Sequence, residues 1–180
     1  MFYDLRVDLL DSDPAIWRQL RVSSILGLSE LHRILVIAMG WSGDGDYDFR
    51  TTGLSSPSAH PCSSQLKATT SLDQVLSTQG DSLLYIYDSA RGWRHKITLE
   101  TILTAPLQVG EASLPQVRCL AGEGSGPPEF CDGVWGYVEL LERLNDSDDP
   151  EYDHLWQRVG YDFDPYSFNL DALNQHLQGT

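Results

Sequence analysis

The sequence predicts an α+β fold: an antiparallel sheet of strands of mixed length, with an N-terminal helix and a C-terminal group of helices. Three observations lead to this prediction. Segments between residues 2 and 99 alternate apolar and polar side chains, the period of a half-buried strand. From residue 136 onward, apolar residues recur every three or four positions, the period of a helix. The chain shows neither strand–helix–strand alternation nor an internal repeat.

The first predicted elements form a hairpin. Residues 2–10 alternate apolar with charged side chains and are predicted to be a strand. The segment Asp11–Pro14 has the composition of a turn. Residues 16–22 are predicted to be a second strand that pairs with the first.

Residues 29–39 are predicted to form the N-terminal helix. Ser29 can cap this helix, because its hydroxyl can accept a hydrogen bond from an amide that otherwise has no partner. Gly40 is expected to end the helix. Residues at helical spacing form its inner stripe: Leu31, Ile34, Leu35 and Ala38.

The middle of the chain is predicted to contain three further strands. They are residues 47–51, 82–87 and 93–99. Residues 88–92 read as the hairpin loop between the last two, and Ser71 is expected to cap a short helix over residues 72–76. Two stretches are predicted to be irregular: residues 53–66 and 104–116.

Three helices are predicted at the C-terminal end. They are residues 136–144, a helix that opens at Asp149-Pro150 and closes at Gly160, and residues 170–177. The length of 180 residues suits one domain, and no linker composition interrupts it. Residues 1–180 are therefore predicted to be a single domain.

The composition excludes some classes of function. The chain has 12 Lys and Arg against 26 Asp and Glu, a formal net charge of -14. Such a charge repels phosphate backbones, so no direct binding to duplex DNA is expected, and it attracts basic proteins. A surface that only keeps the protein dispersed is the other interpretation. No cofactor and no oligomeric state are predicted.

The N-terminus and the cysteines predict a cytoplasmic protein. Charges occupy the positions where a signal peptide needs an apolar core, and no apolar run is long enough to span a membrane. Three cysteines are an odd, low number, which favours a reducing compartment.

Two groups of residues have some of the features of metal sites. Cys119 and Cys131, with His60 and Cys62, could supply four zinc ligands, but no close cysteine pair is present, so buried free thiols are favoured. The second group consists of Asp44, Asp46 and Asp48, which resemble the start of a calcium loop. The glycine and the distal glutamate that such a loop requires do not follow.

Acid–base chemistry has two candidate residues, His95 and Glu129. Glu129 lies between Pro128 and Phe130, so its pKa is either raised by apolar surroundings or set by hydrogen bonds. No exposed-serine turn and no phosphate-binding loop is present. Six residues are candidates for a pocket: Trp93, His95, Pro128, Glu129, Trp135 and Tyr137.

Carboxylates are the strongest candidates for contact with a partner. Residues 136–180 contain ten acidic residues against Arg143 and Arg158. These either form one acidic face or lie on ordinary solvated helices. The predicted partner-binding residues are Asp44, Asp46, Asp48, Asp146, Asp148, Asp149, Glu151 and Asp153.

The sequence resembles the family of proteins similar to the third open reading frame of plasmid pRiA4b, some of which are called TnpR-like passenger proteins of insertion elements. Motifs along nearly the whole chain carry the resemblance: Pro14-x-Ile16-Trp17-Arg18, Leu28-x-Glu30-Leu31-His32, Ala38-Met-Gly-Trp41, Tyr85-x-Tyr87-Asp88, Trp93-Arg-His95-x-Ile97, Cys119-Leu-x-Gly-Glu123, Pro127-Pro-Glu-x-Cys131, Gly136-Tyr137 and Phe163-Asp-Pro165-x-x-Phe168. The resemblance implies a small α+β fold and no settled activity.

The chain departs from this family at several polar positions. The family's Ser-His-Leu-His run is replaced at residues 44–48, so both histidines are missing, and a family cysteine is replaced by Gly126. The family's Asp-Phe-Gly-Asp and a later aspartate are replaced by residues 88–92 and Phe130. A recombinase activity is not expected either, because the chain lacks an arginine cluster and has Asp8 where the nucleophilic serine would stand.

These observations leave three hypotheses. The first is a non-catalytic domain, carried on mobile or phage-like DNA, that binds a basic nucleic-acid-handling protein by charge mimicry. The second is a metal-dependent or acid–base enzyme acting on nucleic acids, with a partly degenerate site that includes His95 and Glu129. The third is a module that stacks peptides or bases on its tryptophans: Trp17, Trp41, Trp93 and Trp135.

Overall fold

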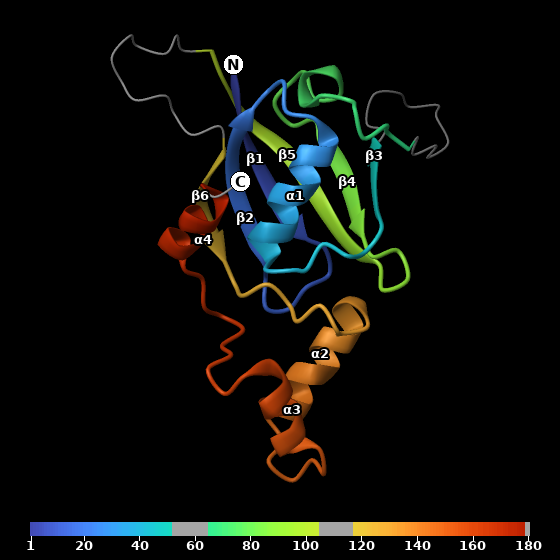
Figure 1. Cartoon of the computed structure of the whole chain (residues 1–180), viewed down its shortest axis with the longest axis vertical. Helices are drawn as coiled ribbons and strands as arrows, with labels where there is room; N and C mark the ends of the chain where they lie inside the picture. The colour runs from blue at the N-terminus through green and yellow to red at the C-terminus, as the bar shows by residue number, and fades with distance from the viewer. Residues whose placement is uncertain (52–64, 105–116, 179–180) are drawn as a thin grey trace.

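A computed structural model describes residues 1–51, 65–104 and 117–178. One antiparallel sheet of six strands, in the order β3-β4-β5-β1-β2-β6, forms its centre (Figure 1). The strands are β1 Phe2–Leu9, β2 Trp17–Ser23, β3 Tyr47–Thr51, β4 Ser82–Tyr87, β5 Trp93–Leu103 and β6 Val117–Glu123. The helices are α1 Leu28–Met39, the short η1 Leu72–Gln74, α2 Gly133–Leu144, α3 Tyr152–Val159 and α4 Leu170–Leu177. The α+β class is confirmed.

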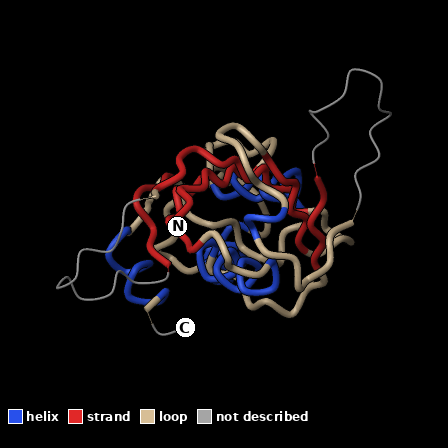
Figure 2. Tube along the Cα trace, turned by 90° about the horizontal axis from the view of Figure 1, so that it is seen from above, coloured by secondary structure: helices blue, strands red, loops and turns tan. Residues whose placement is uncertain are grey.

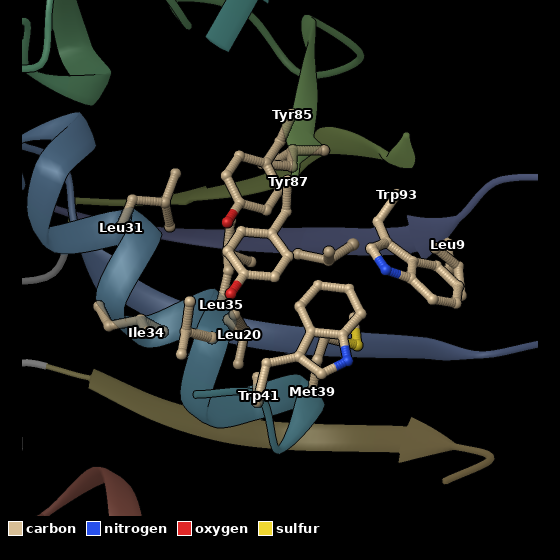
Figure 3. Packing of buried hydrophobic residues seen from close by; sticks show 14 of the residues in the cluster. Leu9, Leu20, Leu31, Ile34, Leu35, Met39, Trp41, Tyr85, Tyr87 and Trp93 are labelled. Atoms are coloured by element: carbon tan, nitrogen blue, oxygen red, sulfur yellow. The ribbon is translucent and has the colours of Figure 1, made fainter. Parts of the chain in front are cut away.

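The core lies between α1 and the sheet, whose strands form one curved layer with helices on its concave side (Figure 2). Odd-numbered residues of β1 and even-numbered residues of β2 point toward α1 and are buried. Aromatic residues of β4 and β5 meet α1 and Trp41 in the same core (Figure 3). Alternation along each strand therefore explains which face is covered.

The other face of the sheet is polar, and its charged side chains pair with one another. Arg21 on β2 donates to both carboxylate oxygens of Asp4 on β1, at 2.7 and 2.8 Å. Arg6 donates to Asp8 at 2.8 Å, and Gln19 donates to Glu100 on β5 at 2.7 Å. No described helix covers these residues, so this face is open to solvent and its charged side chains pair within the sheet.

The two edges of the sheet are also occupied. On β6, the Asn174 side chain accepts a hydrogen bond from the Cys119 amide at 2.8 Å and donates to the Cys119 carbonyl at 2.9 Å, as a neighbouring strand would. On β3, the Leu66 amide donates to the Phe49 carbonyl at 2.8 Å. Both contacts protect an edge that could otherwise pair with another chain.

Several predicted boundaries were wrong. Helix α1 begins at Leu28, and Gly27, not Ser29, occupies its N-cap, where the Glu30 side chain accepts a bond from the Gly27 amide. Strand β6 was not predicted, β5 extends to Leu103 and α2 begins at Gly133. Most of the two predicted loops lies outside the described residues.

Helices α2 and α3 lie beyond the end of the sheet, below it in Figure 1. Helix α4 returns to pack against β6 and α1. No helix in the described part of the chain has the length and apolar character needed to cross a bilayer.

Candidate functional site

The end of the sheet near α2 brings together three segments that are distant in the sequence: residues 41–46, 88–92 and 124–134. Glycines permit their close approach. A Cβ atom on Gly126 would lie 1.9 Å from the Met39 carbonyl oxygen, and one on Gly133, whose φ is +68°, would lie 2.4 Å from the Arg91 carbonyl oxygen. The cysteine that the family resemblance implies at position 126 has no room here.

Arg18 fixes this junction from inside. Its side chain, only 3% exposed, donates from Nε to the Ala38 carbonyl at 3.0 Å and from Nη1 to the Glu123 carbonyl at 2.8 Å. Its guanidinium lies 4.6 Å from the ring centre of Phe168. Burial lowers the pKa of Arg18 to about 10, and the main-chain carbonyls serve as its partners in place of a carboxylate.

Glu129 is the centre of a hydrogen-bond cluster at the surface. One carboxylate oxygen accepts from the Tyr87 hydroxyl at 2.5 Å and the Ser42 hydroxyl at 3.0 Å, and the other accepts from the Ser42 amide at 2.8 Å. Burial raises the pKa of Glu129, but these hydrogen bonds outweigh burial and hold the pKa below its usual value. The alternative with a raised pKa is wrong: Glu129 is a carboxylate that joins two segments.

His95 lies deep in the core rather than beside Glu129. Its ring is fully buried and packs edge-on against Trp41, which stacks on Tyr87. Burial lowers the pKa of His95 to about 3, although nearby main-chain groups of β4 and β5 oppose the shift. The imidazole is therefore neutral and has no route to a substrate in solution.

The pocket candidates separate into three groups. Trp93, His95 and Tyr137 are fully buried core residues. Glu129 lines a shallow surface hollow together with Ser42, Asp44 and Arg91, while Pro128 is half-buried beside it. Trp135 is 79% exposed and lines a second small hollow with Arg94 and Asp132.

The cysteines that can be placed do not form a metal centre. Cys119 on β6 and Cys131 before α2 are buried free thiols, and burial raises the pKa of Cys131 to about 11. His60 and Cys62 lie outside the described residues. Within residues 1–51, 65–104 and 117–178, no group of three or more His, Cys, Asp or Glu residues is arranged to hold a metal ion.

The first acidic segment is largely engaged within the chain. Asp46 accepts hydrogen bonds from the Ser89 amide and hydroxyl, which lower its pKa. Asp48 pairs with Arg50 at 2.6 Å within β3. Asp44 stays exposed at the rim of the hollow beside Ser42. Among the residues that the structure describes, only Asp44 of these three carboxylates has no side-chain hydrogen bond or ion pair.

The second acidic segment forms the turn between α2 and α3, the lowest part of Figure 1. Asp149 and Glu151 both pair with Arg143. Asp146 accepts a hydrogen bond from the Asp148 amide. The side chains of Asp148 and Asp153 are exposed and have no hydrogen bond or ion pair with the residues that the structure describes.

A further acidic stripe lies on the outer face of α2. From Cys131 to Leu144, the exposed residues are Asp132, Trp135, Glu139 and Glu142. Their spacing of three, four and three residues places them on one side of a helix. This spacing is visible in the sequence, but the predicted helix began at residue 136 and therefore left out Asp132 and Trp135.

Comparison with known proteins identifies relatives. The family model described as "Plasmid pRiA4b ORF-3-like protein" matches residues 1–172. The chain is similar to "Uncharacterized protein y4hQ" of Sinorhizobium fredii, with 32% identity over 176 residues, 95% of this chain and 88% of that protein. Its structure is similar to the crystal structure of MM3350, a "protein of unknown function" from Methanosarcina mazei Go1, with a TM-score of 0.78, 29% identity and coverage of 95% and 96% of the two chains.

Proposed function

We propose that this chain, which belongs to the plasmid pRiA4b ORF-3-like family, is a non-catalytic interaction domain that binds a basic protein through its α2–α3 region. The partner would be a protein that handles nucleic acids in the cytoplasm. The gene for this chain would be carried on mobile or phage-like DNA.

The distribution of unpaired carboxylates carries this proposal. On the sheet, Asp4, Asp8 and Asp48 each pair with an arginine of the same chain. On α2 and the following turn, exposed carboxylates outnumber the available arginines, because Arg143 already pairs with two of them. Residues 132–159 contain eight acidic residues against Arg143 and Arg158, so this stretch alone contributes -6 of the -14 net charge.

Such a charge distribution suits a basic partner. Concentrated negative charge increases the rate of encounter with a positive surface, and competes with the phosphates that this surface normally holds. The acid–base alternative has less support. The Glu129 carboxylate already accepts hydrogen bonds from the Tyr87 and Ser42 hydroxyls, and His95 is fully buried.

Affinity capture with charge variants tests the proposal. The full chain is immobilised and exposed to a lysate of its own cell at about 50 mM and about 500 mM salt. The test variant combines Asp146→Asn, Asp148→Asn and Asp153→Asn. The control variant loses the same charge at exposed positions elsewhere, Asp13→Asn, Asp73→Asn and Asp171→Asn. The captured protein is then tested for nucleic-acid binding with and without the chain.

The expected result is a basic protein retained at low salt by the wild type and the control but not by the test variant. This protein should lose its nucleic acid when the chain is added. Retention that is equally strong at high salt, or equal loss in both triple variants, would contradict a binding surface at the α2–α3 turn.

A further inference from the structure

Trp135 is the most exposed large hydrophobic residue of the described chain, at 79%. It lies in the first turn of α2, on the outer stripe that also contains Asp132, Glu139 and Glu142. An exposed indole at a helix surface has a solvation cost and contributes nothing to the core. Tryptophan is also the residue type most enriched among the residues that dominate protein interfaces.

Two half-buried aromatic rings of this chain are covered by arginines, whereas the exposed rings of Tyr161 and Tyr166 are not. The Arg6 guanidinium lies 3.7 Å from the ring centre of Trp17. The same guanidinium donates to Asp8 at 2.8 Å, while the Trp17 indole N–H donates to Glu123 at 2.8 Å. Arg158 lies 3.8 Å from the ring centre of Phe130 in a similar way. An arginine over an aromatic face thus occurs at both rings, and at Trp17 a carboxylate lies next to the cation.

Trp135 has the carboxylates of this arrangement without the cation. Asp132 lies one turn before it and Glu139 one turn after it on the same face. All 12 Lys and Arg residues lie in the described ranges, and none of them is over the Trp135 ring. Arg91 and Arg94 share a hollow with Trp135, but they pair with Asp88 and Asp11.

We infer that Trp135 receives an arginine of the basic partner, which stacks on the indole between Asp132 and Glu139. This inference rests on the proposed function and identifies the contact that anchors it. Arginine fits better than lysine, because its planar guanidinium can stack on the ring while its N–H groups donate to carboxylates at both sides.

Peptides of defined charge test this contact. A fluorescently labelled nona-arginine peptide, a nona-lysine peptide and an uncharged nona-citrulline peptide are titrated with the full chain, and affinity is measured by anisotropy. The variants are Trp135→Ala, Trp135→Phe and, as the matched exposed aromatic, Tyr166→Ala, whose side chain is 73% exposed. Circular dichroism checks that each variant is folded.

The wild type is expected to bind nona-arginine more tightly than nona-lysine and not to bind nona-citrulline. Trp135→Ala should weaken nona-arginine binding about threefold to tenfold, and Trp135→Phe should weaken it less. The affinity for nona-lysine should change less than that for nona-arginine, and Tyr166→Ala should change neither.

Two contrary results separate the inference from the proposed function. In the first, Trp135→Ala binds nona-arginine like the wild type, but the triple variant Asp146→Asn, Asp148→Asn, Asp153→Asn does not. The arginine contact at Trp135 is then refuted, and the acidic binding surface is retained. If the wild type shows no salt-sensitive binding to nona-arginine, both are refuted.

Discussion

Trp17 on the open face of the sheet and Trp135 on the outer face of α2 both lie beside carboxylates, but only Trp17 also contacts a cation. The sheet face follows the same pattern throughout. Its aspartates pair with arginines of neighbouring strands or of the same strand, whereas Glu139 and Glu142 have no such partner within the described residues.

This difference separates charges that serve the fold from charges that are available to another molecule. Cross-strand pairs add to the pairing of the strands that carry them. Unpaired carboxylates on a helix repel one another slightly and stabilise nothing in the chain. The two surfaces should therefore respond differently to substitution, and three measurements test that expectation.

The largest effect is expected where α2 is attached to the sheet. Gly126→Ala places a Cβ atom that would lie 1.9 Å from the Met39 carbonyl oxygen, so the segment leading to α2 must move. We expect a loss of about 4 kcal/mol or more in the free energy of unfolding, measured by urea denaturation. Gly27→Ala is the control, because its nearest atom would lie 3.5 Å away. A small effect at Gly126 would mean that the segment leading to α2 is not held against the end of α1.

An intermediate effect is expected from pH, and it should come from the core rather than from either charged surface. The pKa of His95 is about 3 in the folded chain and 6.5 when exposed. Below pH 6.5 the unfolded chain therefore binds a proton that the folded chain does not, and stability falls as the pH falls toward 3. The expected loss is about 2 kcal/mol between about pH 6.5 and about pH 4.5.

His95→Phe should remove most of this dependence. His32, whose pKa burial also lowers, contributes in the same interval, so some slope should remain. Urea denaturation at several pH values measures the slope for both proteins. An unchanged slope in the variant would mean that His95 is not the source of the acid sensitivity, and would leave His32 and the surface carboxylates as its source.

The sequence predicted most of the fold because alternation and helical spacing are local signals. The bounds of β3, β4 and α4 agree with the predictions, and the hairpin of β1 and β2 is confirmed. Strand β6 was missed because Gly122 and the turn-forming residues after it obscure its alternation. Its glycine is explained by tertiary structure: a Cβ atom there would lie 2.6 Å from the Phe168 ring.

The site was less predictable, because its contacts join residues far apart in the sequence. Pro128 and Phe130, the sequence neighbours of Glu129, suggested apolar surroundings. Its hydrogen-bond partners Tyr87 and Ser42 come from other segments, so the sequence did not reveal them. Trp135 was identified as a candidate, but its exposure depends on where α2 begins. Pairing on the sheet face depends on strand register, which one sequence does not specify.

The smallest effect, and the most direct comparison of the two surfaces, is expected from single neutralisations. Asp4→Asn leaves the Arg21 guanidinium without its carboxylate and should lower the free energy of unfolding by about 1.5 kcal/mol. Glu139→Gln removes a carboxylate that has no partner in the described chain and should change stability by no more than about 0.5 kcal/mol. Urea denaturation in one buffer measures both, and Arg21→Gln, alone and together with Asp4→Asn, completes the cycle that shows how much of the first effect belongs to the pair. If Glu139→Gln costs as much as Asp4→Asn, the outer face of α2 serves the fold, and the reason for assigning its carboxylates to a partner disappears.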